Sequence, residues 1–326
     1  MVFKRLLGSL GVGGPTVDTV LDPGAALPGS TLSGRVDLRG GSADHEIEHI
    51  GLELVARVEA EHAEGESEGA VAFERFTVGG GFRLAEGAEF SVPFSVTLPW
   101  ETPVTELYGQ DLGVVLGVRT ELAVAGAKDK GDLDRLTVGP LPVQEAILEA
   151  FGQLGFGFRS ADLEYGHIGG TGQRLPFYQE IELTPSERYA HAFNEIELTF
   201  LAGPAGVEVV LEADKHHAGS DTLARFTVGH HDSHDWNTEV DGWVRELAER
   251  GSSYGTPGAY GAHDPYGPGH PHGHSSAPGM GTAVAAGAAG LAVGVAGGLV
   301  AAEVVDEVGD FFEDEGDDGD GGEEEG

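Results

Sequence analysis

Two long stretches of the sequence alternate apolar and polar residues at every second position. Within residues 17–138 this alternation is clearest in four segments: 32–39, 52–59, 92–98 and 114–124. Sustained alternation is typical of half-buried antiparallel strands. Gly, Pro and Asp separate the segments, and Pro93 indicates an edge strand or a bulge. Short strands at this spacing predict a β-sandwich of roughly immunoglobulin type over residues 1–139.

The hydrophobic period changes after Pro142 and then returns to two. Apolar residues at 143, 147, 148, 151 and 154 share one helical face, so we expect a short helix near 143–154 between two lobes. Four further alternating segments follow: 177–183, 196–200, 207–213 and 223–228. They predict a second sandwich, and the whole second unit spans residues 140–250. A closing helix is expected around Val240–Leu247, with Thr238 and Asp241 at the spacing of a capping box.

The composition changes at residue 251. Residues 251–280 are a Gly/Pro/His-rich linker, residues 281–302 are an Ala/Gly-rich apolar segment, and residues 303–326 hold thirteen acids and no base. The compositions of the linker and of the acidic tail predict disorder. The expected fold class is therefore mainly β: two sandwich lobes joined by a short helix, with a C-terminal helix and a disordered acidic tail.

Charge and cysteine content exclude several functions. The formal net charge is −37, which repels phosphate backbones, so we expect no nucleic-acid partner. The chain has no cysteine and therefore no thiol nucleophile, disulfide or cysteine-ligated metal. The first fourteen residues lack the long apolar run and cleavage site of a signal peptide, so we expect a cytoplasmic protein.

Two short matches to enzyme motifs lie in the wrong structural context. His45, Glu46 and His49 form a literal H-E-x-x-H, but this segment leads directly into an alternating strand. Strand residues four apart are separated by about 13 Å, so the two histidines cannot share one zinc ion. Residues 251–255 form a literal G-x-S-x-G that follows a helix rather than a strand, which does not fit a nucleophile elbow. We predict no catalytic residue and no cofactor.

A histidine cluster is the remaining candidate for metal binding. His230, His231 and His234 lie close to Asp232 and Asp235, and imidazoles with carboxylates suit zinc or nickel. Polar loops beside a strand are the simpler interpretation. A metal-dependent enzyme using these second-lobe histidines stays open as an alternative function.

The apolar segment 281–302 has its own pattern of small residues. Gly290, Gly294 and Gly298 are four apart and line one face of a helix, which allows close helix packing. We expect self-association or weak membrane contact through this segment, so the protein is cytoplasmic or peripheral to the membrane. A low-complexity arm is the simpler interpretation, and a membrane-associated structural scaffold is a further alternative.

Taken in order, several segments resemble the bacterial sporulation-control protein family. The most specific is VPFSVTLPWETPVT at 92–105, followed by the linker at 140–156. The other matching segments are 3–7, 17–21, 28–29, 34–36, 40–41, 46–48, 174–177 and 179–181. The resemblance covers about residues 1–250.

The resemblance implies a fold and a type of function. Members of this family carry an arrestin-like pair of β-sandwiches, and the family offers no enzymatic residues to transfer. It implies a non-catalytic regulatory or adaptor protein that acts through protein partners in sporulation or developmental control. Exposed edge strands, sheet faces and the groove between the lobes are the expected contact surfaces.

Overall fold

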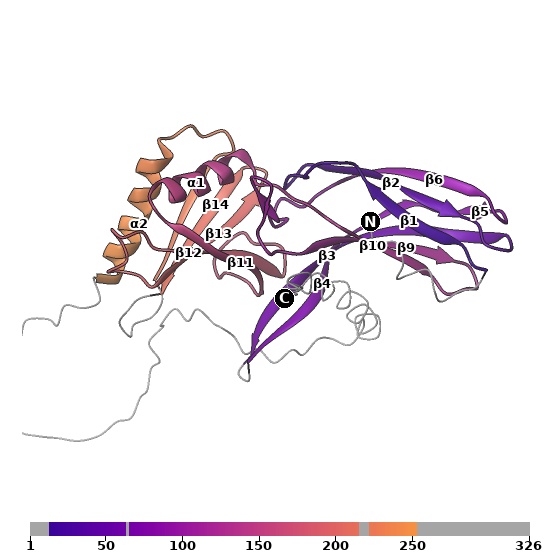
Figure 1. Cartoon of the computed structure of the whole chain (residues 1–326), viewed down its shortest axis with the longest axis horizontal. Helices are drawn as coiled ribbons and strands as arrows, with labels where there is room; N and C mark the ends of the chain where they lie inside the picture. Colours follow the sequence, from indigo (N-terminus) through magenta and orange to yellow (C-terminus); the bar gives the residue numbers. More distant parts are fainter. Residues whose placement is uncertain (1–12, 63–64, 215–221, 253–326) are drawn as a thin grey trace, which may run out of the picture.

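The chain folds into two elongated lobes that lie end to end (Figure 1). The computed structural model describes residues 13–62, 65–214 and 222–252. Strands dominate both lobes, and two helices belong to the second lobe. The prediction of a mainly β protein is therefore confirmed.

The first lobe is a β-sandwich of two packed sheets. One sheet has the order β1 (Thr16–Leu21), β2 (Thr31–Arg39) and β6 (Glu89–Thr97). The other contains β10 (Lys130–Arg135), β9 (Leu116–Val124), β3 (His45–His62), β4 (Gly65–Gly79) and β5 (Phe82–Leu84). A two-stranded hairpin of β7 (Glu106–Leu107) and β8 (Gln110–Asp111) lies beside them.

The alternating apolar residues fill the space between these two sheets. Val36, Leu54 and Leu122 are each 0% exposed, and their polar neighbours in the sequence point away from the core. Polar contacts also join the two sheets: the hydroxyls of Thr19 and Thr120 lie 2.6 Å apart, and the Thr19 N–H donates to the Asp132 carboxylate at 2.6 Å. The residues that alternate with a period of two in the sequence therefore form the core of the first-lobe sandwich.

The second lobe combines one sheet with two helices. Its described strands form one antiparallel sheet, in the order β11 (Gly157–Tyr165), β12 (Phe177–Thr184), β13 (Glu195–Gly203), β14 (Gly206–Asp214) and β15 (Thr222–Val228). Helices α1 (Pro142–Gln153) and α2 (Trp236–Ser252) supply the second layer (Figure 1). Their apolar faces join the same hydrophobic cluster as the sheet, and Trp243 of α2 stacks on Phe226 of β15 at 4.8 Å.

The two lobes also share a sheet. Strand β3 is eighteen residues long and extends beyond the sandwich, where Glu59 pairs in parallel with Glu164 of β11. This single pairing makes the large sheets of the two lobes continuous. The period of the sequence predicted each strand but carried no information about pairing between lobes.

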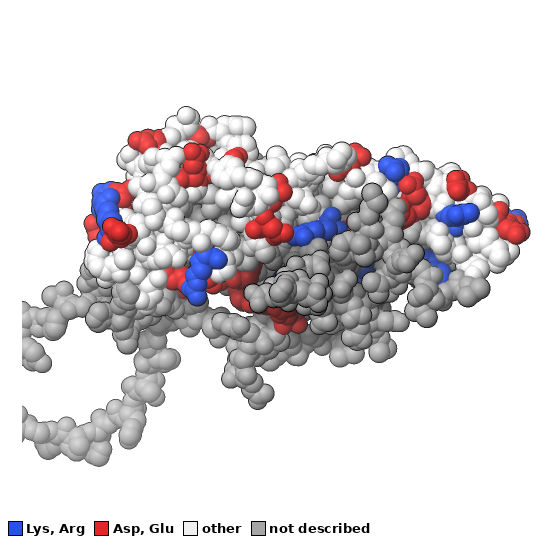
Figure 2. All heavy atoms as spheres, in the orientation of Figure 1, with Lys and Arg blue, Asp and Glu red and all other residues white. Residues whose placement is uncertain are grey.

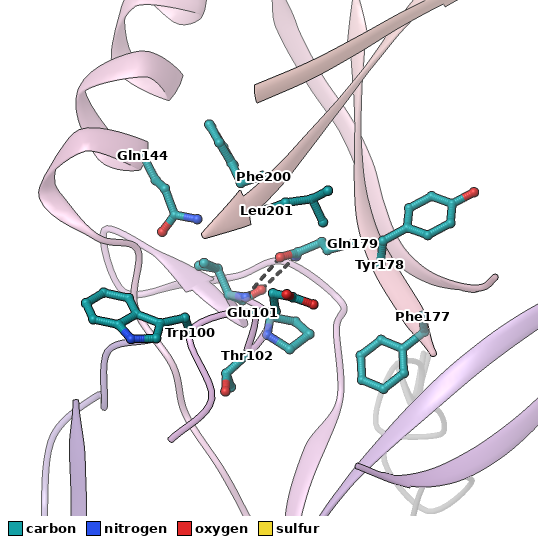
Figure 3. A pocket seen from close by; sticks show the side chains of 11 residues that line it. Trp100, Glu101, Thr102, Gln144, Phe177, Tyr178, Gln179, Phe200 and Leu201 are labelled. Carbon is teal, nitrogen blue, oxygen red and sulfur yellow. Dashed lines mark hydrogen bonds between the residues drawn. The ribbon is translucent and has the colours of Figure 1, made fainter. Parts of the chain in front are cut away.

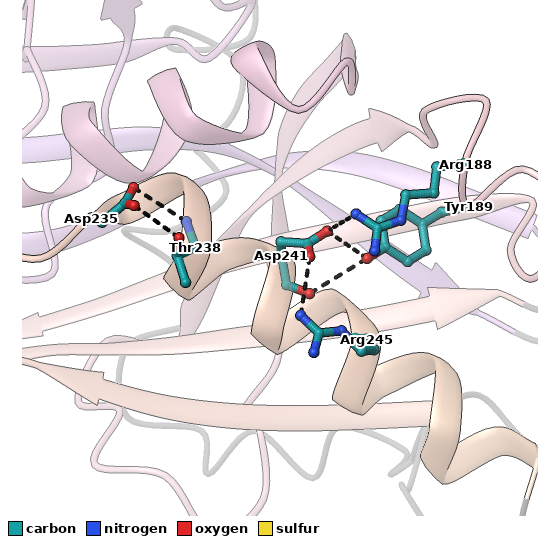
Figure 4. A network of polar contacts seen from close by, with 6 residues as sticks. All are labelled: Arg188, Tyr189, Asp235, Thr238, Asp241 and Arg245. Atoms are coloured by element: carbon teal, nitrogen blue, oxygen red, sulfur yellow. Dashed lines mark hydrogen bonds and ion pairs between the residues drawn. The ribbon is translucent and has the colours of Figure 1, made fainter.

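Helix α2 begins earlier than its expected capping box. The carboxylate of Asp235 accepts bonds from the Thr238 hydroxyl at 2.8 Å and the Thr238 backbone N–H at 3.4 Å, so Asp235 caps the helix (Figure 4). Asp241 instead faces the loop after β12 and accepts hydrogen bonds from the Tyr189 hydroxyl at 2.7 Å and from Arg188 at 2.6 Å. The expected pairing of Thr238 with Asp241 was therefore wrong, because a stronger N-cap residue lies three positions earlier.

We predict that Asp241→Asn weakens the docking of α2. Hydrogen bonds from Tyr189 and Arg245 to the carboxylate lower the pKa of Asp241 below its ordinary 3.8. The ionised Asp241 carboxylate therefore stabilises the folded state above pH 3.8. This stabilisation is lost as the pH falls through the lower pKa of the folded state. We expect the substitution to cost about 1–2 kcal/mol of unfolding free energy near pH 7.

Denaturant titration at several pH values measures this effect. Glu246→Gln is the matched control, because it removes an exposed charge from the same helix. The assigned role of Asp241 would be contradicted if both variants lost the same unfolding free energy. It would also be contradicted if the loss in Asp241→Asn were the same at pH 2 as at pH 7.

Candidate functional site

The lobes are joined where a first-lobe loop docks on the second-lobe sheet. Strands β12 and β13 are paired only from Ile181 to Leu183, so the preceding part of β12 lies outside this ladder. Residues 100–104 of the first lobe lie against this part of β12 and against Phe200 and Leu201 of β13 (Figure 3). We call residues 100–105 the docking loop.

The side chain of Gln179 bonds to the backbone of the docking loop as a neighbouring strand would. Its Oε1 accepts the backbone N–H of Val104 at 2.9 Å, and its Nε2 donates to the Val104 carbonyl at 2.8 Å (Figure 3). Val104 is 3% exposed, so water does not serve these backbone groups. One amide side chain therefore satisfies a buried donor and a buried acceptor of the other lobe.

Glu101 forms the second connection between the lobes. Its carboxylate accepts the backbone N–H of Arg174 at 2.8 and 3.0 Å and that of Leu175 at 2.9 Å. These bonds hold the start of β12 beside the docking loop. Because the acceptor is a carboxylate, they are stronger than bonds between neutral groups.

Trp100 lies between a glycine of its own lobe and a histidine of the other. A Cβ atom at Gly29 would lie 2.4 Å from the indole ring, and the backbone of Gly29 has a φ of +70°. Only glycine fits this position without strain. On the second-lobe side the ring of His230 stacks on Trp100 at 4.9 Å, while its Nε2 lies 2.7 Å from the Gly203 carbonyl oxygen.

The residues at this junction come from segments that are distant in the sequence. Gly29, Trp100, Arg174 and Gln179 all belong to segments that carried the family resemblance. The linker helix contributes Gln144, whose side chain caps the helix through the Leu141 N–H at 2.8 Å and also lines the junction. Sequence reasoning recorded these segments but gave their residues no role, because each partner lies dozens of positions away.

The pocket at the junction is small. It has space for about one water molecule, which is too little for a cofactor. Its lining is instead occupied by hydrogen bonds between the lobes. This arrangement suits a rigid connection that fixes the relative positions of the two lobes.

A group of carboxylates occupies the opposite face of the second-lobe sheet from the helices. Carboxylate oxygens of Asp162, Glu164 and Glu180 all lie within 4.8 Å of one another. Burial, together with the charges of Glu197 and Asp162, raises the pKa of Glu180 from 4.5 to about 9. Oxygen ligands of this kind suit Ca²⁺ or Mg²⁺, so these three are the described residues best placed to hold a cation.

The acidic character extends over the surface of the molecule. Figure 2 shows Asp and Glu side chains spread over both lobes, while Lys and Arg form a few separate spots. On the second-lobe sheet, Glu197 pairs directly with both Glu182 and Glu212 across neighbouring strands. Alternating acids along β11 and β12 are the sequence signal for this face, and the predicted site residues do not include them.

The three candidate histidines do not converge on one point. His230 stacks on Trp100 and bonds to Gly203, whereas His234 lies 3.6 Å from Asp232 and packs edge-on against Trp236. Within residues 13–62, 65–214 and 222–252, the acidic group of Asp162 is the one set of potential ligands that come together, and it contains none of His230, His231 and His234. Metal binding by these histidines stays an untested alternative, and the absence of a metal site there stays the prediction.

The other sequence motifs lie on a strand or outside the described residues. His45, Glu46 and His49 are in β3, as predicted, and His49 lies 3.9 Å from Glu121. The G-x-S-x-G match begins at the end of α2 and continues beyond Ser252. Gly290, Gly294 and Gly298 also lie outside the described residues, with the linker and the acidic tail. Among the helices that the structure describes, none is both long enough and apolar enough to cross a membrane.

Comparisons with known proteins match both lobes. The family described as "Spo0M: SpoOM protein" matches residues 3–217. The sporulation-control protein spo0M of Bacillus subtilis (strain 168) is 37% identical over 218 residues, which cover 67% of this chain and 82% of that protein. A crystal structure of Spo0M from Bacillus subtilis superposes with a TM-score of 0.59 at 30% identity, over 74% of this chain and 98% of that one. The expected arrestin-like fold is confirmed.

We predict that Gln179→Met loosens the connection between the lobes. Methionine keeps the length of the side chain but leaves the Val104 N–H and carbonyl without their partners. Two buried backbone groups without hydrogen bonds should cost about 2–4 kcal/mol. Denaturant unfolding measures the loss, and small-angle scattering reports whether the lobes move.

Gln110→Met is the matched control for that substitution. Gln110 is exposed on β8, so the same change of side chain should leave stability within about 0.5 kcal/mol. Similar losses at both positions would contradict the role given to the Gln179 amide.

We predict that Glu180→Gln stabilises the protein in a manner that depends on pH. Between the unfolded pKa of 4.5 and the folded pKa of about 9, the folded state holds a proton that the unfolded state releases. Native stability therefore falls as the pH rises through this window. Glutamine removes that dependence, so we expect a gain on the order of 2 kcal/mol near pH 8 and none near pH 4.

Thermal unfolding of both proteins between pH 4 and pH 9 tests this prediction. Glu187→Gln, at an exposed position in the loop after β12, is the control for loss of one negative charge. A gain from Glu180→Gln that is the same at every pH would show that burial of this carboxyl is not the cause.

Proposed function

The chain belongs to the Spo0M family of sporulation-control proteins, and we propose from this premise that it regulates sporulation by binding other proteins, without catalysis. The match over residues 3–217 carries the proposal, because it includes the first lobe, the docking loop and the second lobe as far as β14. The junction supports the same conclusion, since hydrogen bonds between the lobes occupy it.

Strand addition to β15 is the proposed mode of binding. Strand β15 ends the large sheet on the second-lobe side, and β6 ends the three-stranded sheet of the first lobe. Pro93 lies within β6, and the position of β6 at the end of its sheet confirms the expected edge strand. Because proline has no N–H to donate, β6 is a poor template for a partner strand. Strand β15 contains no proline, so its outer edge is the better site for a partner strand.

The proposed setting is the cytoplasm. Partners are proteins rather than nucleic acids, because a chain of net charge −37 repels phosphate backbones. The docking loop holds β15 at a fixed position relative to the first lobe, so a partner can contact both lobes at once.

Replacement of the relative in living cells tests the proposal. Bacillus subtilis lacking its own spo0M is supplied with this chain, and heat-resistant spores are counted. We expect restoration toward the level of the parent strain by the unaltered chain. Thr227→Lys, which adds a charge to the exposed edge strand β15, should reduce the restored spore count about tenfold.

Thr184→Lys is the matched control, because Thr184 is exposed at the end of the interior strand β12. It should restore spores as well as the unaltered chain does. Equal restoration by both lysine variants would exclude β15 as the contact, and no restoration by the unaltered chain would count against the sporulation role itself.

A further inference from the structure

An open groove lies between the two helices of the second lobe. Its volume is about 210 Å³, and its walls are the last two turns of α1 and the beginning of α2. Pockets that take whole cofactors or substrates usually enclose roughly 300–1,000 Å³, so this groove suits a single side chain. We call it the helix groove and define it by Ala146, Glu149, Gln153, Asp235, Trp236 and Asn237.

The helix groove is negatively charged. Glu149 of α1 and Asp235 at the N-cap of α2 stand on its two sides, and no lysine or arginine is among the described residues that line it. Asp235 accepts hydrogen bonds from Thr238 and so offsets the positive end of α2, while the negative end of α1 lies at the groove. His234 also lines the groove, but the Asp232 carboxylate lies 3.6 Å from its ring and matches any proton that it takes up.

An aromatic surface and a bridging amide give the groove a fixed shape. The indole of Trp236 is partly exposed, and the ring of His234 packs edge-on against it with 5.1 Å between ring centroids. The Gln153 amide joins the two walls, because it donates to Glu149 at 2.8 Å and accepts from Asn237 at 2.7 Å. The indole and the carboxylate are therefore in place before a ligand arrives.

The first lobe presents a second aromatic side chain near α1. Tyr108 is 63% exposed and is the one non-glycine residue with a positive φ, +54°, in the part of the chain that the structure describes. It forms the β7–β8 turn with Gly109, at a position where asparagine is favoured and a bulky residue is strained. Partial desolvation and the charges of Glu145 and Glu149 raise the pKa of Tyr108 above 10.0, so its hydroxyl lies near the α1 face that leads to the helix groove.

We propose that the helix groove binds an arginine side chain of a protein partner. The guanidinium plane stacks on the Trp236 indole, and the Glu149 carboxylate accepts its N–H groups. Arginine suits the groove better than lysine, because its planar group uses the aromatic surface and the carboxylate at once. The adjoining residues of the partner run past Glu145 toward Tyr108.

This inference rests on the proposed function in one respect, which is that the arginine belongs to a protein. The groove lies in the helix layer, whereas β15 offers backbone groups at the edge of the sheet, so the two contacts are distinct. Failure of each proposal can be told apart. A chain that binds arginine but restores no spores contradicts the sporulation role, and a chain that restores spores but binds no arginine contradicts this inference.

Nuclear magnetic resonance of the full-length chain measures the binding at one indole. The chain has three tryptophans and therefore three indole N–H signals, of which Trp236→Phe identifies the one in the groove. The probe is acetyl-Gly-Arg-Gly-amide at pH 8, where a histidine of ordinary pKa, about 6.5, is neutral. We expect the Trp236 signal to shift with a Kd on the order of millimolar, while the Trp100 signal stays in place.

A matched probe and a matched variant isolate the charge. The same peptide with citrulline in place of arginine keeps the shape but not the charge, and it should bind at least about tenfold more weakly. Glu149→Gln should weaken binding of the arginine peptide several-fold, whereas Glu187→Gln, in the loop after β12, should leave it unchanged. Both glutamates are exposed, and thermal unfolding checks that each variant folds.

The remaining outcomes would overturn the proposal. Equal binding of the citrulline peptide, equal binding in Glu149→Gln, or no saturable shift of the Trp236 signal would show that the groove does not recognise arginine. Tighter binding of spermidine than of the arginine peptide would assign the groove to a free polyamine. A Trp236 signal that moves when the chain alone is diluted would assign it to a second copy of this chain.

Discussion

The arrangement of the two lobes depends on one buried interaction between Gln179 and the backbone of Val104. A backbone N–H and carbonyl removed from water must find partners, and a loop inserted against another lobe has no ladder of its own. The Gln179 amide supplies one donor and one acceptor at 2.8 and 2.9 Å. These two bonds hold the docking loop, and with it one end of the first lobe, against β12.

Other features of the junction follow from that fixed loop. Trp100 is held against Gly29, where a side chain of any size would collide with the indole, and His230 closes the other side of the ring. Glu101 ties down the start of β12 through backbone N–H groups. With the lobes held in this way, the long strand β3 lies close enough to β11 for Glu59 and Glu164 to pair.

The sequence predicted elements well and contacts between distant elements poorly. The linker helix was expected near 143–154 and spans Pro142–Gln153, because its apolar period depends on neighbours within the same helix. His45 and His49 were expected on a strand for the same local reason. By contrast, the bond from Gln179 to Val104 joins residues 75 positions apart, and no period reports it.

The second lobe shows why a period of two does not determine the number of layers. Alternation along Ile196, Leu198 and Phe200 reveals that one face of β13 is apolar, but a helix covers such a face as well as another sheet does. The apolar faces of α1 and α2 were visible in the sequence. The position of α2 against β15 depends on Trp243 and Phe226, which only the folded chain brings together.

The pairing of Glu59 with Glu164 also determines which charged residues of the two lobes share a side. Paired residues of a sheet point to the same side, so Glu53 of the first lobe faces the same way as the carboxylates of β11 and β12. In the first lobe the Glu53 carboxylate is paired with Arg75 and Arg119, whereas the second-lobe carboxylates lie beside one another. An acidic segment that approaches this side of the sheet is therefore repelled more strongly at the second lobe than at the first.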